Sequence, residues 1–376
     1  MHYFDHSATT PLHPKVKKLM GEVGDFHFGN PSSVHAFGQK AKIVIETARG
    51  QMAKAVGCNS NEIFFTSGGT EANNLVLWNL IHQNKKHVVT SVIEHPAVLK
   101  VLDNLEEFGV SYTAVGVDKN GGVNPNEVQN AITADTGLIS IMLANNEMGT
   151  IQPIGEISSI AKEQGIFLHS DAVQALGKIP INAKDLGVDY MSFSAHKFYG
   201  PKGVGALYIR KGLKLQPLII GGSQERRVRA GTENTPGIAG CGLAAELAVN
   251  SIQDTHTHLE SLAKAFKEEI KRISPDVIFN GHPKKNLPGL VNVSFPGYRS
   301  DLLIIYLDRE GIAVSSGSAC SSGDIKPSRI LSEMEINDEI NICSLRISFG
   351  TGNTLEDVDY LTTCFKSTLE RIRSSA

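Results

Sequence analysis

The chain has 376 residues, of which 41% are hydrophobic and 20% are charged, and its formal net charge is −3. These values are typical of a soluble globular protein of about two domains, and they exclude the strongly basic surface of a nucleic-acid-binding protein. The N-terminus has no export signal, and no apolar run approaches the roughly 18 residues of a membrane-spanning helix. We therefore expect a cytoplasmic protein that binds neither nucleic acid nor membranes.

The cysteines and glycines indicate the redox compartment and the fold class of the protein. Five cysteines are scattered along the chain, at positions 58, 241, 320, 343 and 364, without the close pairs of a zinc site. An odd number of scattered cysteines favours free thiols in a reducing compartment over a disulfide framework. The 36 glycines suit an α/β protein with many tight turns between strands and helices.

The N-terminal part begins with a short extended segment, residues 3–11, which ends in a proline. A polar loop at 28–35, which contains Asn30, then precedes a helix predicted from Ala36 to Val56. Such a loop is either a lid that faces a substrate or a plain connection between helices.

A Gly-Gly turn follows the first predicted buried strand, Ile63 to Thr66, and leads into a helix that begins near Gly69 and Thr70. The first N–H groups of a helix are unpaired and its dipole favours negative charge, so this turn would accept a phosphate. The turn matches neither the dinucleotide fingerprint nor the P-loop, and a glycine turn without a ligand is the alternative.

Four further apolar strands are predicted at 87–93, 138–143, 166–169 and 188–193, and each of them ends in polar residues. These are His95, Asn145, Asp171 with Gln174, and Ser194 with His196 and Lys197. Strands that alternate with helices imply a mainly parallel sheet, which binds ligands outside the carboxyl ends of its strands. We therefore expect these side chains and Thr70 to converge on a single site.

Lys197 stands between an apolar strand and the glycine turn 200–205, which leads into a second strand from Ala206 to Arg210. A lysine in this position has little freedom and is partly desolvated. Because burial disfavours the charged form of an amine, such a lysine can form a Schiff base near neutral pH. Taken alone, this segment is more often an ordinary lysine beside a turn than a catalytic one.

An arginine-rich loop at 221–234, which contains Thr232, is too polar for the core. It suits anion binding or a subunit interface, and a solvated run of charges is the alternative. Two helices follow, one from Gly237 to about Asn250 and one with an apolar stripe from Leu259 onward. We place a domain boundary near residue 255, so that residues 15–255 form a large domain and residues 1–14 with 256–376 form a small one.

The small domain is predicted to contain strands at 290–295 and 312–315, a helix at 300–309, and a last helix that begins with a capping box at Thr354. The loop 315–323 consists of small residues and leaves the thiol of Cys320 uncovered, whereas the other four cysteines suit buried, inert positions. The strand 344–350 directs Arg346 away from its apolar face. This arginine binds either a carboxylate of the protein or the carboxylate of a substrate.

The predicted edge of the sheet offers three groups that pyridoxal 5′-phosphate requires. A lysine can carry the aldehyde as an imine, an aspartate can keep the pyridine nitrogen protonated, and the Gly-Gly-Thr helix start can take the phosphate. His95 could stack on the ring and Gln174 could reach its phenolic oxygen. We therefore expect pyridoxal 5′-phosphate as the cofactor.

The whole chain resembles the class V aminotransferase family, and within it the NifS/IscS-type cysteine desulfurases. The matching motifs follow the family's order: DHSATTP at 5–11, GNPSSVH at 29–35, TSGGTEANN at 66–74, EHPAV at 94–98, NNEMGTIQPI at 145–154, HSDAVQALGK at 169–178, SFSAHKFYGPKGVGALYIR at 192–210, RAGTEN at 229–234 and SSGSACSSG at 315–323. The resemblance implies the fold type I of pyridoxal enzymes. That fold has a large domain with a mainly parallel, seven-stranded sheet flanked by helices, and a smaller α+β domain.

The resemblance also implies a reaction, in which L-cysteine becomes L-alanine and its sulfur is left on Cys320 as a persulfide. An acceptor protein, such as an iron–sulfur cluster scaffold, would then take the sulfur. Alternatives are an ordinary aminotransferase, which would not need Cys320, a selenocysteine lyase, and a non-enzymatic scaffold of the same fold.

The implied roles are as follows. Lys197 would form the imine and take the Cα proton, and His95 would stack on the ring and carry a proton. Asp171 would contact the pyridine nitrogen of the cofactor, and Gln174 and Asn145 would contact the oxygen side of its ring. The phosphate would be bound by Gly69, Thr70, Ser194 and His196, and by Thr232 from the other subunit of a homodimer. Arg346 would bind the substrate carboxylate, with Asn30 nearby.

The sequence departs from the family's usual pattern at four positions beside the site. His6 and Ser7 stand where asparagines are usual, and Ser223 and Ala230 stand where glycine and serine are commoner. These departures bear on the fit of the substrate and leave the expected chemistry unchanged.

Overall fold

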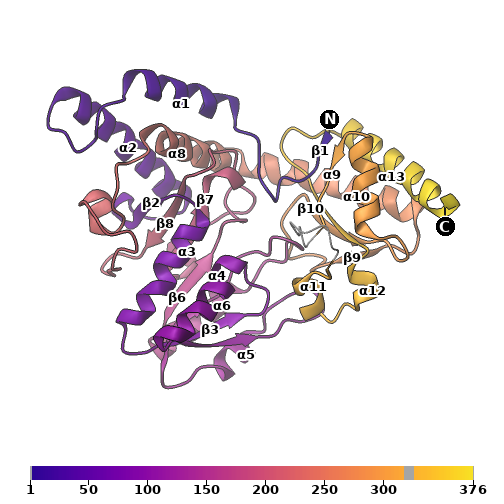
Figure 1. The fold of residues 1–376 in the computed structure, drawn as a ribbon, viewed down its shortest axis with the longest axis horizontal. Coiled ribbons are helices and arrows are strands. Elements are labelled where there is room, and N and C mark those ends of the chain that lie inside the picture. Colours follow the sequence, from indigo (N-terminus) through magenta and orange to yellow (C-terminus); the bar gives the residue numbers. More distant parts are fainter. Residues whose placement is uncertain (1, 317–325, 376) are drawn as a thin grey trace.

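The computed structural model describes residues 2–316 and 326–375, and its largest feature is a seven-stranded sheet (Figure 1). The strand order is β2–β8–β7–β6–β5–β3–β4. The strands are β2 Ile63–Thr66, β3 His87–Ser91, β4 Ser111–Val115, β5 Thr136–Ser140, β6 Phe167–Asp171, β7 Tyr190–Ser194 and β8 Gly205–Ile209. Among them, β8 runs antiparallel to both of its neighbours and the other pairs are parallel. The predicted mainly parallel α/β sheet is confirmed.

Helices cover both faces of this sheet. They are α1 Pro14–Phe26, α2 Ala36–Ala55, α3 Gly69–Trp78, α4 Pro96–Leu105, α5 Pro125–Asn130, α6 Ile154–Gln164, α7 Ala183–Leu186 and α8 Thr235–Asn250. Consecutive side chains of a strand point to opposite faces, so Val88 packs with α3 and α4 while Val89 packs with α2, α6 and α8. Short 3₁₀ turns lie at Ser60–Glu62, Asn79–His82, Glu106–Phe108, Ala195–Lys197 and Gln224–Arg227.

The C-terminal part has its own hydrophobic core around a three-stranded antiparallel sheet, in the order β12–β10–β9. The strands are β9 Ile278–Asn280, β10 Leu290–Ser294 and β12 Ser344–Ser348, and the helices are α9 Ile252–Ile273, α10 Ser300–Arg309, α11 Arg329–Glu333, α12 Asp338–Asn341 and α13 Leu355–Ser375. The predicted capping box is present, since Thr354 N donates to Asp357 and Asp357 N donates to the Thr354 hydroxyl.

The N-terminal segment joins this second core rather than the first. Strand β1, His2–Tyr3, pairs in parallel with β11, Ile312–Ala313, and Phe4 is fully buried in the core of the C-terminal part. Figure 1 shows the chain ends on the same side of the molecule. The division into a large domain of residues 15–255 and a small domain of residues 1–14 and 256–376 stays a prediction.

Cys241, Cys343 and Cys364 are buried free thiols, and Cys58 is a partly buried one. Within residues 2–316 and 326–375, no group of three or more His, Cys, Asp or Glu side chains is arranged to hold a metal ion. In the same part of the chain, every helix is too short or too polar to cross a membrane.

The arginine-rich loop covers the edge strand of the large sheet. Glu225 is buried and forms two hydrogen bonds with Arg49 of α2, at 2.7 and 2.8 Å. The same carboxylate accepts the backbone N–H of Phe65 on β2 at 2.9 Å, and Arg49 also donates to the carbonyl of Ile63. An edge strand exposes unpaired backbone groups, and here a buried ion pair occupies them. At Glu225 the loop is therefore structural rather than a solvated run of charges.

We predict that Glu225→Gln lowers the free energy of unfolding by about 3 kcal/mol, because it leaves the buried Arg49 guanidinium without its counter-charge. Urea denaturation measures the change, with Glu163→Gln on the exposed face of α6 as the matched control. Equal stability of the two variants would contradict the structural role of the ion pair.

Candidate active site

A cavity of about 570 Å³ lies at the carboxyl edge of the large sheet, where the N-terminal segment and β12 of the C-terminal part close it. The helix start of α3 and the segments that follow β3, β6 and β7 all contribute to its lining. The predicted site residues that line it are Gly69, Thr70, His95, Asp171, Gln174, Ser194, His196, Lys197 and Arg346. The structure thus brings together most of the residues that the strand-end argument placed there.

Lys197 is held by the backbone of the N-terminal segment. Its ammonium donates to the carbonyl oxygens of Ser7 and Ala8, at 2.5 and 2.8 Å. Burial, and then the positive charge of Arg346, lower the pKa of Lys197 to about 8, against the opposing effect of nearby carboxylates. About a tenth of this amine is therefore uncharged, and so nucleophilic, at pH 7, far more than for an ordinary lysine.

Asp171 and His95 lie in the cavity wall with fixed orientations. The Asp171 carboxylate accepts hydrogen bonds from the Asn73 amide at 2.6 Å and from the backbone N–H of Val173 at 3.0 Å. The Nδ1 atom of His95 accepts the backbone N–H of Ala97 at 3.0 Å, which places the proton of the neutral ring on Nε2. Desolvation by the surrounding protein lowers the pKa of His95 and favours this neutral form.

The start of α3 forms the anion-binding end of the cavity. Gly68 precedes the helix, so no side chain caps the N–H groups of its first turn. A Cβ atom on Gly69 would lie 2.5 Å from Cγ2 of Val173 and 3.6 Å from Cβ of Ser194, so only glycine leaves this space open. His196 also lines the cavity, and its Nδ1 atom forms a hydrogen bond with the Thr9 hydroxyl at 3.1 Å. Burial and neighbouring lysines lower the pKa of His196 to about 4, so it is neutral.

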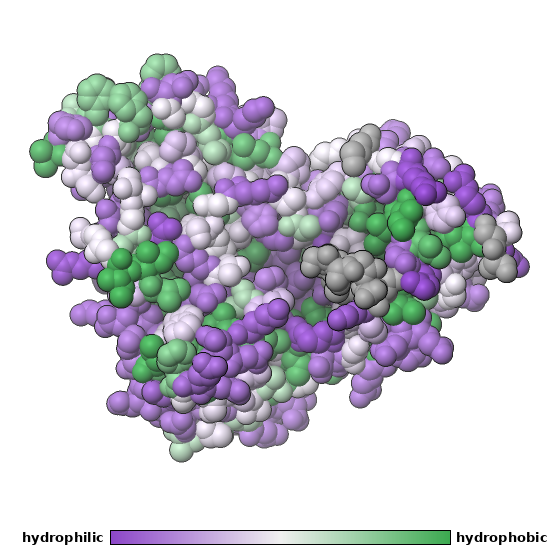
Figure 2. Space-filling model, viewed as in Figure 1, coloured by the Kyte–Doolittle hydropathy of each residue, from purple (hydrophilic) through white to green (hydrophobic). Residues whose placement is uncertain are grey.

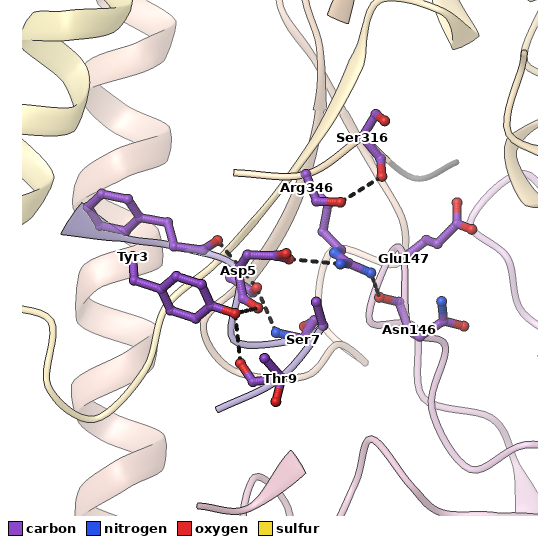
Figure 3. A network of polar contacts seen from close by, with 12 residues as sticks. Tyr3, Asp5, Ser7, Thr9, Asn146, Glu147, Ser316 and Arg346 are labelled. Atoms are coloured by element: carbon purple, nitrogen blue, oxygen red, sulfur yellow. Dashed lines mark hydrogen bonds and ion pairs between the residues drawn. The ribbon is translucent and has the colours of Figure 1, made fainter. Parts of the chain in front are cut away.

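Arg346 reaches the cavity from β12 and is buried (Figure 3). Its Nη2 atom donates to the Asp5 carboxylate at 2.8 Å, and its Nη1 atom donates to the carbonyl of Asn146 at 3.0 Å. The Nε atom is buried and has no hydrogen-bond partner among the described residues. Of the two interpretations of this arginine, the structure contains the pair with a carboxylate of the protein, and it leaves one N–H group unpaired.

Among the described residues, three of the predicted ones do not line this cavity in the single chain. Asn145 lies behind the wall, because its amide bonds to the carbonyl of Ile93 and to two backbone N–H groups of its own turn. Asn30 is exposed and its side chain accepts the N–H of Ser32 within the α1–α2 connection. Thr232 is exposed beside a smaller, separate pocket, and Cys320 lies outside the described residues. Their roles stay predictions.

The structure adds polar residues that the sequence argument did not single out. Arg329 lines the rim of the cavity and donates to the carbonyls of Val92 and Glu94. Lys178 donates to the side-chain oxygen of Gln174 at 2.8 Å. Lys178 stands four residues after Gln174, a spacing that allows contact within one helical turn, and this signal could have been noticed. Arg329 offered no such signal, because its partners are backbone carbonyls of a distant strand end.

The fold and the cavity define an α/β protein with a buried lysine of lowered pKa in a cavity at the carboxyl edge of its sheet. The chain belongs to the aminotransferase class-V family, which it matches over residues 2–361. The cysteine desulfurase IscS of Dictyoglomus turgidum is 47% identical over 375 residues, which cover 99% of this chain and 95% of that protein.

Solved structures agree with this membership. A NifS-like protein superposes with a TM-score of 0.93 at 38% identity, covering 98% of this chain and 99% of that one. A structure described as SspA in complex with cysteine superposes with a TM-score of 0.81 at 35% identity, covering 93% and 99%. The seven-stranded sheet expected from the resemblance is thus confirmed by the fold and by its structural neighbours.

We predict that Lys197 reacts as an amine with a pKa of about 8 rather than the ordinary lysine value of about 10.4. Reductive methylation with formaldehyde, on protein stripped of bound small molecules, should reach half of its maximal rate at Lys197 near pH 8, because only the neutral amine reacts. Peptide mass spectrometry measures each lysine separately, and the exposed Lys202 is the internal control. Identical pH profiles for the two lysines would contradict the prediction.

Proposed function

We propose that this protein is a pyridoxal-phosphate-dependent cysteine desulfurase, which converts L-cysteine to L-alanine and takes the sulfur onto Cys320 as a persulfide. The observation that carries the proposal is the amine of Lys197, held on two carbonyls at the cavity that Asp171 and Arg346 also line. The cysteine desulfurase relatives, at 41% to 47% identity over nearly the whole chain, support the choice of reaction.

The cavity fits the proposed cofactor. Lys197 would hold its aldehyde, Asp171 would hold the pyridine nitrogen, and Gln174 would reach the phenolic oxygen. The open turn at Gly69, with Ser194 beside it, would take the phosphate at the start of α3. Pyridoxal 5′-phosphate, when bound, supplies an aldehyde for the amine and a ring that withdraws electrons from the Cα–H bond of an amino acid.

The residues of the chain then bind the substrate and move its proton. Arg346 would bind the carboxylate of L-cysteine, with its unpaired Nε as a donor that Asp5 does not use. Lys197 would take the Cα proton, since an amine with a pKa of about 8 gains and loses a proton readily near neutral pH. The neutral His95, with its proton on Nε2, would serve as a second proton carrier.

Cys320 would complete the reaction as a thiolate, the nucleophilic form of cysteine. Its sulfur attacks the sulfur of the substrate, so an S–S bond forms and the C–S bond breaks with its electron pair left on carbon. That carbon takes a proton and alanine is the product. The reaction needs no external oxidant, because the two-electron reduction of the substrate carbon, from C–S to C–H, is matched by the oxidation of the transferred sulfur to the outer sulfur of the persulfide.

We also propose a cytoplasmic location, where thiols stay reduced, and delivery of the persulfide sulfur to an acceptor protein such as an iron–sulfur cluster scaffold. The substrate, acceptor and location are inferred from the desulfurase reaction and the family resemblance.

A homodimer is supported by an apolar surface at the α1–α2 connection (Figure 2). Large hydrophobic side chains there are strongly exposed: Phe26, Phe28, Val34, Phe37 and Ile43 are 55% to 93% accessible. Exposed apolar patches of this kind mark protein–protein interfaces. In such a dimer, Thr232 of one subunit would contact the phosphate in the cavity of the other.

We predict that Cys320→Ala abolishes sulfide and persulfide formation from L-cysteine, because the attacking thiolate is missing. Sulfide and alanine are measured together on the purified, cofactor-loaded protein, and Cys58→Ala is the matched control for loss of a free thiol. Undiminished persulfide formation by Cys320→Ala would contradict the proposed function. Amino transfer to a 2-oxo acid in place of alanine release would favour an aminotransferase.

The contribution of Thr232 across the dimer predicts complementation between two inactive variants. Lys197→Ala and Thr232→Asp homodimers are each expected to have little activity. After dissociation and random remixing, half of the dimers combine the two chains and carry one intact site, which restores about one quarter of the wild-type sites. No recovery, with mixed dimers confirmed by native mass spectrometry, would contradict a role for Thr232 in the partner's cavity.

A further inference from the structure

Lys178 lies next to the cavity but outside the set of residues assigned above. It follows β6 in the turn that also carries Gln174, and its ammonium donates to the Gln174 Oε1 atom at 2.8 Å. Lys178 lines a second cavity of about 270 Å³, which Lys197 also borders. Lys178 therefore borders a cavity that the anion-binding turn does not line, whereas Gln174 lines the first cavity together with that turn.

The contacts of Gln174 fix which way its amide faces. Its Nε2 atom donates to the carbonyl of Ser7 at 2.9 Å, and the same carbonyl accepts the Lys197 ammonium at 2.5 Å. A flipped amide would place Oε1 against the carbonyl of Ser7, where two acceptors repel, and would place an NH₂ group against the charged form of Lys178, which can only donate. Lys178 and Ser7 together allow a single orientation.

In that orientation the amide has one N–H group to spare. Nε2 carries two hydrogens, and a hydrogen bond to Ser7 uses one of them. The second N–H has no partner among the described residues, and Gln174 lines the cavity. An oxygen in the cavity with negative charge would accept this hydrogen bond.

We propose that Lys178 is a positioning residue, which orients the Gln174 amide so that it presents an N–H group, and not its carbonyl oxygen, to the phenolic oxygen of the bound cofactor. This inference rests on the proposed function, since the phenolic oxygen belongs to pyridoxal 5′-phosphate. Lys178 acts through Gln174 and does not itself touch the reacting atoms.

The electrostatic setting of Lys178 is unfavourable for stability, which supports a functional reason for the residue. Burial, together with the charges of Lys197 and Arg346, lowers its pKa to about 7. An apolar side chain of similar length would avoid the cost of burying an amine beside two other cations. A residue that is costly to the fold and that orients a residue of the site is typical of the trade-off between stability and activity.

Lys178→Met tests the inference on the cofactor-loaded protein. We expect kcat/KM for L-cysteine to fall by about tenfold or more, as for loss of a hydrogen bond to a charged group. We also expect the pH midpoint of the cofactor's visible absorbance, measured without substrate, to rise, because both the N–H donor and a nearby positive charge are lost. Thermal stability should be unchanged or higher, and Lys178→Arg should recover part of the activity.

A double-variant comparison shows whether Lys178 acts through Gln174. If it does, Lys178→Met should have little further effect in a Gln174→Ala background. Lys267→Met is the matched control, since Lys267 is also a partly buried lysine whose pKa is lowered by burial, and its ammonium lies over Phe279 in the other core. We expect the control to retain the wild-type spectrum and activity.

Multiplicative effects of the two substitutions, or an unchanged pH midpoint in Lys178→Met, would overturn the positioning role while leaving the proposed function intact. A wild-type protein that binds no pyridoxal 5′-phosphate, or releases no alanine from L-cysteine, would overturn the proposed function and the inference with it. The wild-type measurement therefore separates the two failures.

Discussion

The site depends on the bond between the Lys197 ammonium and the carbonyls of Ser7 and Ala8. These carbonyls belong to an N-terminal segment that the C-terminal part anchors, since Phe4 is buried in its core and β1 pairs with β11. Thr10 in turn donates to the carbonyl of His196, next to the lysine. The amine at the end of a strand in the large sheet is therefore positioned by a segment that Phe4 anchors in the other hydrophobic core.

Burial and neighbouring cations lower the pKa of two lysines, Lys197 in the cavity wall and Lys178 beside the cavity. Burial is the larger cause of both shifts, and the charges of Arg346, at both lysines, and of Lys197, at Lys178, lower the pKa further. The compensating carboxylates are Asp5, which pairs with Arg346, and Asp171. A dianionic phosphate and a substrate carboxylate would complete the balance of charge, which agrees with the chemistry we propose.

Much of the site could be predicted from the sequence, because parallel strands bring their carboxyl ends to one edge. This rule predicts that His95, Asp171 and Lys197 lie close together, and all three line the same cavity. Strand β4 was not predicted, since its residues are partly exposed and polar at the edge of the sheet. The contacts of Lys197 could not be predicted either, because backbone carbonyls have no residue type that reveals them.

Peptide mapping after borohydride reduction tests the central claim most directly. Reduction of the purified protein should attach the mass of pyridoxal phosphate to the peptide that contains Lys197, and prior addition of L-cysteine should diminish that attachment. Attachment to a different lysine, or no attachment in a protein that retains the cofactor, would contradict the account.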